Sequence, residues 1–370
     1  MAKTRWQKSI STANQDGETA DSTNSTGPPV LQQSVHKVAQ QTKEFTPVQA
    51  GKKPQGDQEP FASSFPALNS FPNINRVKSE QGVWLEDMGS ITQAFVQFYS
   101  NLLRANDGCR ANVSSEIVSQ GPILTEHHRH LLRCDFTEKE IKQATFAIPS
   151  NKAPRWDGYN SHFFKSSWSI VGEDVVYAVR DFSSTSKLLR EVSVTTLTLA
   201  PKTQAPRTLG EYRPIACCST IYKCIFKLIC HRLSLILLDI ISHTQGAFVS
   251  GRSIMHNALI CQDMMRFYRP SQIQDCCMFK LDVKKAYDTV SWVFMEEMMK
   301  ALGFPDQFVK LIMVCITSPL YSLIINCIPS EPIKPNRGLR QGDPLITSPI
   351  HSLHGVFFQS NEEGGSTSWV

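Results

Sequence analysis

The chain has 370 residues, of which 41% are hydrophobic, and its 38 Lys and Arg against 33 Asp and Glu give a formal net charge of +5. This length allows two domains or one domain with tails, and so small a net charge does not by itself indicate a nucleic-acid partner. The basic N-terminus lacks the apolar segment of a secretory signal, and the longest apolar stretch, 233–241, is far shorter than the ~20 residues that cross a bilayer. Secreted and membrane proteins are therefore disfavoured.

The first 82 residues differ in composition from the rest of the chain. They are rich in Ser, Thr, Gln, Pro, Gly and Asn, and their apolar residues show no sustained period. Such a segment buries too little surface to offset its chain entropy, so we predict a disordered polar tail over 1–82. The 11 cysteines have no zinc-ligand spacing and lie mostly in apolar segments. They indicate reduced thiols in an intracellular protein, either nuclear or cytoplasmic.

Helical periodicity begins near Gly89 and recurs along the chain. Thr137 and Glu140 have the spacing of a capping box, Ser219 can cap a long apolar helix, and Gly303 is placed as a helix stop. We predict helices over 89–103, from 138 onward, over 168–182, 220–238, 254–268 and 292–302.

Strand patterns are interspersed among these helices. Apolar and hydroxyl residues alternate over 192–200, a second strand begins at 212, and 276–283 is a short apolar run. Residues 320–327 and 333–337 predict a β-hairpin around Pro329. Because no regular strand–helix–strand repeat is present, the pattern favours an α+β fold.

Asp282 stands at the end of the apolar run 276–283. A carboxylate there is costly if it is buried unpaired, but it is well placed to bind a divalent cation such as Mg²⁺. The alternative is a strand followed by a Lys-rich turn, in which Asp282 caps the next element. The segment by itself leaves both interpretations open.

Two further segments carry groups suited to phosphate. In 337–345, Gly338 and Gly342 would let the backbone approach a ligand, and Arg340 and Gln341 offer planar donors; an ordinary turn is the alternative. Upstream, Lys202 and Arg213 flank a polar hairpin loop and can clamp a triphosphate, or they can be two solvated charges.

Five segments occur in one order: NKAPRWDGY (151–159), LAPK to EYRPI (199–215), QGAFVSGRSIMHNAL (245–259), FKLDVKKAYD (279–288) and RGLRQGDPL (337–345). Together they resemble the reverse transcriptase of LINE-type (non-LTR) retrotransposons, the plant elements most closely, over roughly 89–345. The resemblance implies a right-hand polymerase with fingers and palm, which takes an RNA template, a DNA primer and a dNTP. It implies no membrane partner, and nothing in the sequence points to a protein partner.

The resemblance also assigns roles to single residues. Asp282 matches the metal-binding aspartate of the palm, with the Val283 carbonyl as an auxiliary Mg²⁺ ligand. Tyr287 matches the aromatic gate under the sugar of the incoming nucleotide. The matches at Lys202, Arg213, Gln341 and Gly342 are with residues that bind nucleotide. From their charge, we also expect Lys284, Lys285 and Arg340 to contact nucleic-acid phosphates.

The sequence departs from the family pattern in several places. No Asp-Asp pair follows Leu345, the thumb is missing, and Arg155 and Trp156 replace the family's Gly-Pro in the first loop. The predicted division is a tail (1–82), a helical lead-in (83–150), fingers with an incomplete palm (151–345) and a divergent C-terminal tail (346–370). We therefore expect a truncated, catalytically inactive polymerase; the alternatives are a nucleic-acid-binding remnant without activity or a product without function.

Overall fold

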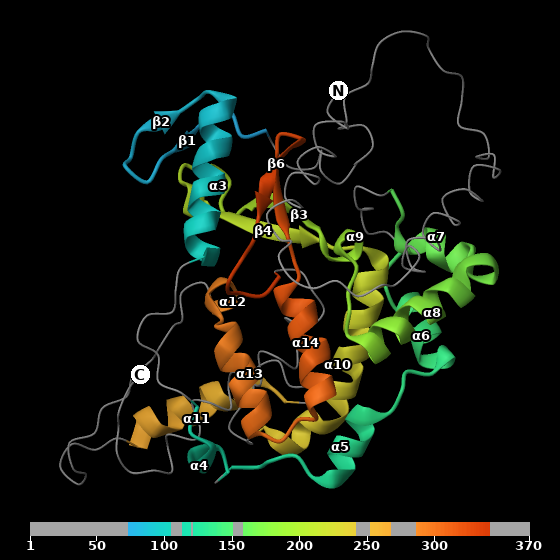
Figure 1. Ribbon diagram of the computed structural model, residues 1–370. Coiled ribbons are helices and arrows are strands. Elements are labelled where there is room, and N and C mark those ends of the chain that lie inside the picture. The colour runs from blue at the N-terminus through green and yellow to red at the C-terminus, as the bar shows by residue number, and fades with distance from the viewer. Residues whose placement is uncertain are drawn as a thin grey trace, which may run out of the picture. The chain divides into compact units, whose positions relative to one another are not determined.

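The computed structural model describes residues 73–104, 113–119, 121–150, 158–241, 252–267 and 286–340. Its larger sheet has four strands in the order β4-β3-β5-β6 (Figure 1). Strand β3 is antiparallel to β4 and parallel to β5, and β6 is antiparallel to β5. The four strands are β3 (Thr195–Pro201), β4 (Tyr212–Cys217), β5 (Tyr321–Ile325) and β6 (Ile328–Ile333). This mixed sheet, surrounded by helices, confirms the predicted mixture of helix and sheet.

The helices of the described part differ greatly in length. They are α3 (Met88–Arg104), α4 (Ser115–Val118), α5 (Glu126–Arg133), α6 (Glu138–Phe146), α7 (Ser161–Ser166), α8 (Trp168–Thr185), α9 (Arg190–Ser193), α10 (Thr220–Ile240), α11 (Ile254–Phe267), α12 (Ala286–Thr289), α13 (Trp292–Ala301) and α14 (Asp306–Thr317), with a 3-10 turn, η4, at Leu209–Glu211. Helix α10 contacts α5, α6, α8 and α9, and α13 packs beside α14 (Figure 1). Much of the core therefore lies around α10, whose Ile229, Leu233 and Ile236 are fully buried.

Three helix-end signals in the sequence are confirmed. Thr137 Oγ1 accepts a hydrogen bond from the Glu140 amide at 3.2 Å, and Glu140 accepts one from the Thr137 amide at 2.8 Å. Ser219 Oγ accepts from the Tyr222 amide at the start of α10. Gly303 follows α13 with φ of +83°, and its amide donates to the Lys300 carbonyl.

The hairpin of the larger sheet turns earlier than the sequence pattern predicts. Its turn is Asn326–Cys327, where φ is 48° and 65°, and Pro329 lies inside β6 rather than in the turn. Two consecutive positive φ angles are typical of the tight turn that matches strand twist. Because β6 is an edge strand, the missing N–H of Pro329 is tolerated there.

The predicted boundary of the disordered tail, at residue 82, lies too late in the chain. Strands β1 (Val77–Lys78) and β2 (Trp84–Leu85) pair with each other, and Val77 is completely buried. The Ile74 amide and carbonyl both bond to the Asn326 side chain, at 2.8 and 3.0 Å. Residues 73–82 are therefore part of the folded unit, whereas residues 1–72 lie outside the described part.

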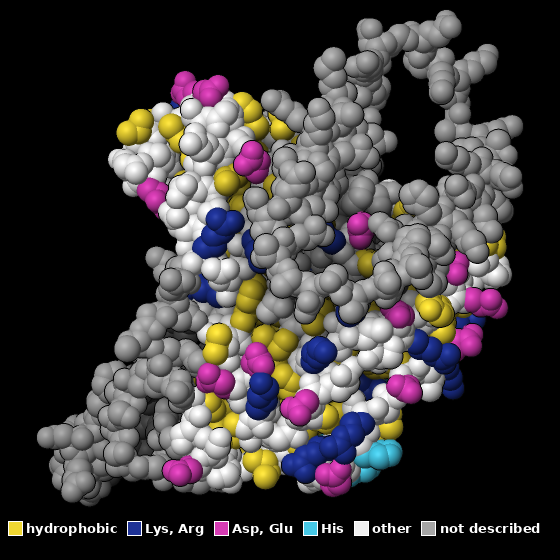
Figure 2. Space-filling view, viewed as in Figure 1, with side chains coloured by type: hydrophobic (Ala, Val, Ile, Leu, Met, Phe, Trp, Pro, Cys, Tyr) yellow, Lys and Arg dark blue, Asp and Glu magenta, His cyan; other side chains and the backbone are white. Residues whose placement is uncertain are grey.

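One face of the described part carries charges of both signs. On the face shown in Figure 2, Lys and Arg side chains are interspersed with Asp and Glu over α13, α14 and α5. This mixture on one face agrees with the small net charge of the chain. Within the described residues, no helix is both long and apolar enough to span a membrane.

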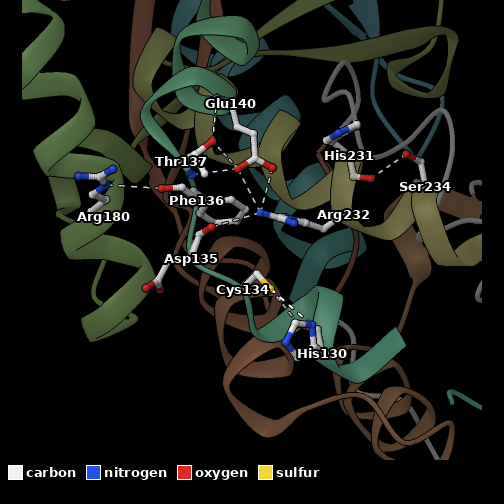
Figure 3. Close-up of polar contacts among 10 residues, drawn as sticks. All are labelled: His130, Cys134, Asp135, Phe136, Thr137, Glu140, Arg180, His231, Arg232 and Ser234. Atoms are coloured by element: carbon white, nitrogen blue, oxygen red, sulfur yellow. Dashed lines mark hydrogen bonds and ion pairs between the residues drawn. The ribbon is translucent and has the colours of Figure 1, made fainter. Parts of the chain in front are cut away.

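A partly buried ion pair joins α6 to α10 (Figure 3). Arg232 Nη2 lies 2.9 Å from Glu140 Oε1 and also donates to the Asp135 carbonyl at 3.2 Å. The Glu140 carboxylate in turn accepts bonds from the Thr137 amide and hydroxyl, both at 2.8 Å. Burial by itself would raise the pKa of Glu140, but the Thr137 hydrogen bonds and the Arg232 charge together lower it. The charged pair is therefore the stable form of this contact.

Candidate functional site: a basic hairpin loop and two converging segments

Lys202 and Arg213 lie at the loop end of the β3–β4 hairpin. Arg213 pairs with Ala200 in the register, and the Lys202 amide extends the ladder by donating to the Glu211 carbonyl at 2.8 Å. Side chains alternate along a strand, so Lys202, two residues after Ala200, falls on the same face as Arg213. Both side chains are exposed, and neither forms an ion pair with another described residue. Two cations at one end of a hairpin are suited to binding a polyanion.

The loop between these two residues is held by its own hydrogen bonds. Glu211 accepts from the amides of Arg207 and Thr208, and Lys202 Nζ donates to the Gly210 carbonyl at 2.7 Å. The Arg207 amide is the main cause that lowers the pKa of Glu211, with smaller contributions from Thr208. The Glu211 carboxylate is thus bound by backbone amides. Among the described residues, no acidic side chain forms an ion pair with Arg213.

Helix α3 fixes the β4 strand from the other face of the sheet. Tyr212 packs edge-to-face on Phe95, with ring centroids 5.3 Å apart, and its carbonyl accepts from Tyr99 Oη at 3.4 Å. Burial raises the pKa of Tyr99 and, less strongly, that of Tyr212, so both rings are neutral around pH 7. Arg213 therefore projects from a strand whose opposite face is anchored in the core.

The segments 279–288 and 337–345 meet at their described ends. Gly338 donates from its amide to the Val290 carbonyl and accepts from Trp292 Nε1, both at 2.8 Å. Its φ is +87°, and a Cβ built on it would lie 2.7 Å from the Asp288 carbonyl oxygen. Gly338 therefore allows a close approach to the backbone of Asp288, not to a ligand as the sequence suggested. The two segments are in direct contact at Gly338 and Asp288. The Gly338 and Trp292 contacts were not foreseen from the sequence.

Arg340 is buried rather than displayed to solvent, with 5% of its surface exposed. Its Nη2 donates to the Ser193 carbonyl at 3.1 Å, and its Cζ lies 3.9 Å from the centroid of the Tyr222 ring. In this conformation the guanidinium does not reach a phosphate at the surface. Its predicted contact with nucleic acid is untested and would require the side chain to leave this position.

The other predicted site residues lie largely outside the described part. This is so for Asp282, Val283, Lys284, Lys285, Gln341 and Gly342, and for residues 151–157 of the first loop. Tyr287 lies in α12, next to the buried Asp288. Among the described residues, no group of three or more His, Cys, Asp or Glu is arranged to hold a metal ion. The Mg²⁺ site therefore stays a prediction, because its two expected ligands are not among these residues.

Comparisons with known proteins identify the segment that contains these features. Residues 200–354 match the sequence model of the family "Reverse transcriptase (RNA-dependent DNA polymerase)". The chain is 30% identical over 275 residues to the "Transposon TX1 uncharacterized 149 kDa protein" of Xenopus laevis, a match that covers 74% of the chain and 21% of that protein. It is 25% identical over 229 residues to the "Retrovirus-related Pol polyprotein from type-2 retrotransposable element R2DM" of Drosophila melanogaster, with 62% and 21% covered. The chain thus spans about a fifth of the length of each relative.

Proposed function

We propose that residues 151–345 supply the nucleotide-binding part of an RNA-directed DNA polymerase, the reverse transcriptase of a LINE-type (non-LTR) retrotransposon. The observation that carries the proposal is the match of residues 200–354 to the reverse transcriptase family. That segment contains every residue to which the sequence assigns a chemical role, from Lys202 to Gly342. Its relatives are proteins of transposable elements, which supports the same assignment.

In the proposed reaction, the 3′-hydroxyl of a DNA primer attacks the α-phosphate of a dNTP that is paired with an RNA template, and pyrophosphate leaves. Lys202 and Arg213 hold the triphosphate from the hairpin loop, and Tyr287 lies under the sugar of the incoming nucleotide. Gln341 and Gly342 pack on the new base pair, while Lys284 and Lys285 contact nucleic-acid phosphates. Asp282 and the Val283 carbonyl would hold Mg²⁺, which neutralises charge at the reacting phosphate when it is bound. This chemistry suits an intracellular protein.

Loss of either hairpin cation is expected to weaken dNTP binding. Charge-assisted hydrogen bonds contribute about 1.5–3 kcal/mol each, so Lys202→Ala and Arg213→Ala should each raise the Kd about ten- to a hundredfold. The measurement is equilibrium titration of a fluorescent dATP analogue in the presence of Mg²⁺. The matched control is Lys310→Ala, which removes an exposed lysine from α14. Its Kd should stay within about twofold of the Kd of the unaltered chain. Equal effects at Lys202 and Lys310 would argue against a triphosphate site at the hairpin.

We expect the 370-residue polypeptide by itself not to extend a primer, with either Mg²⁺ or Mn²⁺. Asp282 is the one carboxylate that the family pattern assigns to the metals in these residues, and two ions about 4 Å apart need several carboxylates to balance their repulsion. The assay is extension of a labelled DNA primer on an RNA template at rising protein concentration. Extension that Asp282→Ala abolishes would show that another carboxylate of these 370 residues completes the site.

A further inference from the structure

The guanidinium of Arg340 contacts three groups that place it at the base of the β3–β4 hairpin. Nη2 donates to the Ser193 carbonyl at 3.1 Å, Nη1 lies 3.6 Å from Cys218 Sγ, and the guanidinium stacks over the Tyr222 ring. Ser193 stands two residues before β3, and Cys218 directly follows β4. Arg340 therefore binds both chain segments at the base of the hairpin that carries Lys202 and Arg213 at its other end.

The groups around Arg340 are themselves held by hydrogen bonds. Tyr222 is completely buried, and its hydroxyl donates to the Cys315 carbonyl at 3.1 Å. Ser219, which caps α10 on the Tyr222 amide, also donates its hydroxyl to the Val192 carbonyl at 3.2 Å. The base of the hairpin and the first turn of α10 are thus joined by contacts that do not involve Arg340. A side chain that docks here takes its position from the sheet and from α10 together.

We propose that Arg340 is a positioning residue of the polymerase site rather than a nucleic-acid contact. Its docking holds the chain at residue 340 against the base of the β3–β4 hairpin, the hairpin that carries Lys202 and Arg213 at its other end. The proposal rests on the proposed function, because it deepens the account of the same site. It differs from the sequence-based role of Arg340, in which the guanidinium reaches out to phosphate.

The geometry also predicts that lysine cannot replace arginine at this position. A guanidinium is planar, so it can stack its face on Tyr222 while its edge donates to Ser193 and approaches Cys218. A lysine ammonium would retain the charge but has no planar face and no fork of donors. Lysine should therefore fail to replace Arg340 if the role is positioning, and should largely replace it if the role is to contact a phosphate.

Binding of a fluorescein-labelled RNA template–DNA primer duplex, followed by anisotropy at several salt concentrations, distinguishes the two roles. Under positioning, Arg340→Ala and Arg340→Lys both weaken binding about tenfold or more, with the same salt slope as the unaltered chain. Tyr222→Leu should reproduce this loss, while Tyr222→Phe, which keeps the ring, should not. An unchanged affinity in Arg340→Ala overturns the proposal. So does a slope of log K against log salt that is shallower by about 0.7–0.9 in Arg340→Ala, if Arg340→Lys restores both slope and affinity.

Hydrogen exchange gives a readout that needs no nucleic acid. Arg340→Ala should speed exchange in peptides covering 190–200 and 334–340. The matched control is Arg129→Ala, because Arg129 Nε also donates to a backbone carbonyl, that of Gly303 at 3.0 Å, but joins α5 to the end of α13. Arg129→Ala should leave those two peptides unchanged. Exchange that is the same in both variants refutes the docking role. If exchange is faster only in Arg340→Ala, but the unaltered chain binds no duplex, the docking role of Arg340 is upheld and the polymerase assignment is refuted.

Discussion

Replacing Arg232 with alanine is expected to lower the free energy of unfolding by about 2–3 kcal/mol, because it breaks a charge-assisted, partly buried ion pair. The change removes the partner of Glu140 and leaves a partly buried carboxylate without its counter-charge (Figure 3). It also removes the donor to the Asp135 carbonyl and the guanidinium that lies 5.6 Å from the Phe136 ring. The measurement is urea unfolding followed by far-UV circular dichroism.

An exposed ion pair of the same chain supplies the control. Lys300 Nζ contacts Glu296 one turn away on α13, and both side chains are about half exposed. Such pairs contribute about 0.3–0.5 kcal/mol, so Lys300→Ala should change stability very little. The double variant Arg232→Met with Glu140→Leu should lose less than Arg232→Ala, because it leaves no buried charge. A loss for Arg232→Ala no larger than that for Lys300→Ala would contradict the account of a partly buried pair.

Substituting Gly338 with alanine is expected to lower the free energy of unfolding by at least about 2 kcal/mol and to weaken duplex binding as well. Two effects combine at this position. A φ of +87° is unfavourable for a residue with a Cβ, and that Cβ would lie only 2.7 Å from the Asp288 carbonyl oxygen. Because the obstacle is backbone, α12 and the chain at Gly338 must move apart, which separates the two segments that converge at the site.

Gly82 separates the two effects. Its φ is +83°, nearly the same as that of Gly338, but no atom lies within 4 Å of the position of its Cβ. Gly82→Ala should therefore show only the backbone penalty, about 1–2 kcal/mol, and should leave duplex binding unchanged. Thermal unfolding and anisotropy of the two variants, measured together, test this. Equal losses of stability in the two variants would mean that the close contact between the new Cβ and the Asp288 carbonyl costs no free energy of folding.

The helix ends are the part of the fold that the sequence predicts well. Thr137 with Glu140, Ser219 and Gly303 act through local hydrogen bonds and backbone angles, which neighbouring residues determine. Helix α14 was not predicted, although Pro305 and Asp306 mark its start and its apolar side chains recur at helical spacing. Its two Val and two Ile weaken the local preference for helix, and packing against α13 makes up the difference.

The candidate site is less predictable because its contacts are distant in sequence. Arg340 meets Ser193, which lies 147 residues earlier in the chain, and no local pattern reveals that burial. Likewise, Gly338 marks a close approach, but the sequence does not say whether a ligand or the Asp288 backbone stands there. Lys202 and Arg213 were easier to place together, because a short antiparallel hairpin brings the two ends of its own loop side by side.

The parallel pairing of β3 with β5 bears on how the protein folds as it is synthesised. Residues 195–198 pair with residues 321–324, so more than a hundred residues must leave the ribosome before this edge of β3 is covered. The β3–β4 hairpin can form early, because its partners are neighbours in sequence. Until β5 arrives, the other edge of β3 offers unpaired backbone groups to any strand nearby. The nascent chain thus passes through a period of vulnerability to aggregation, and the arrival of residues 321–325 ends it.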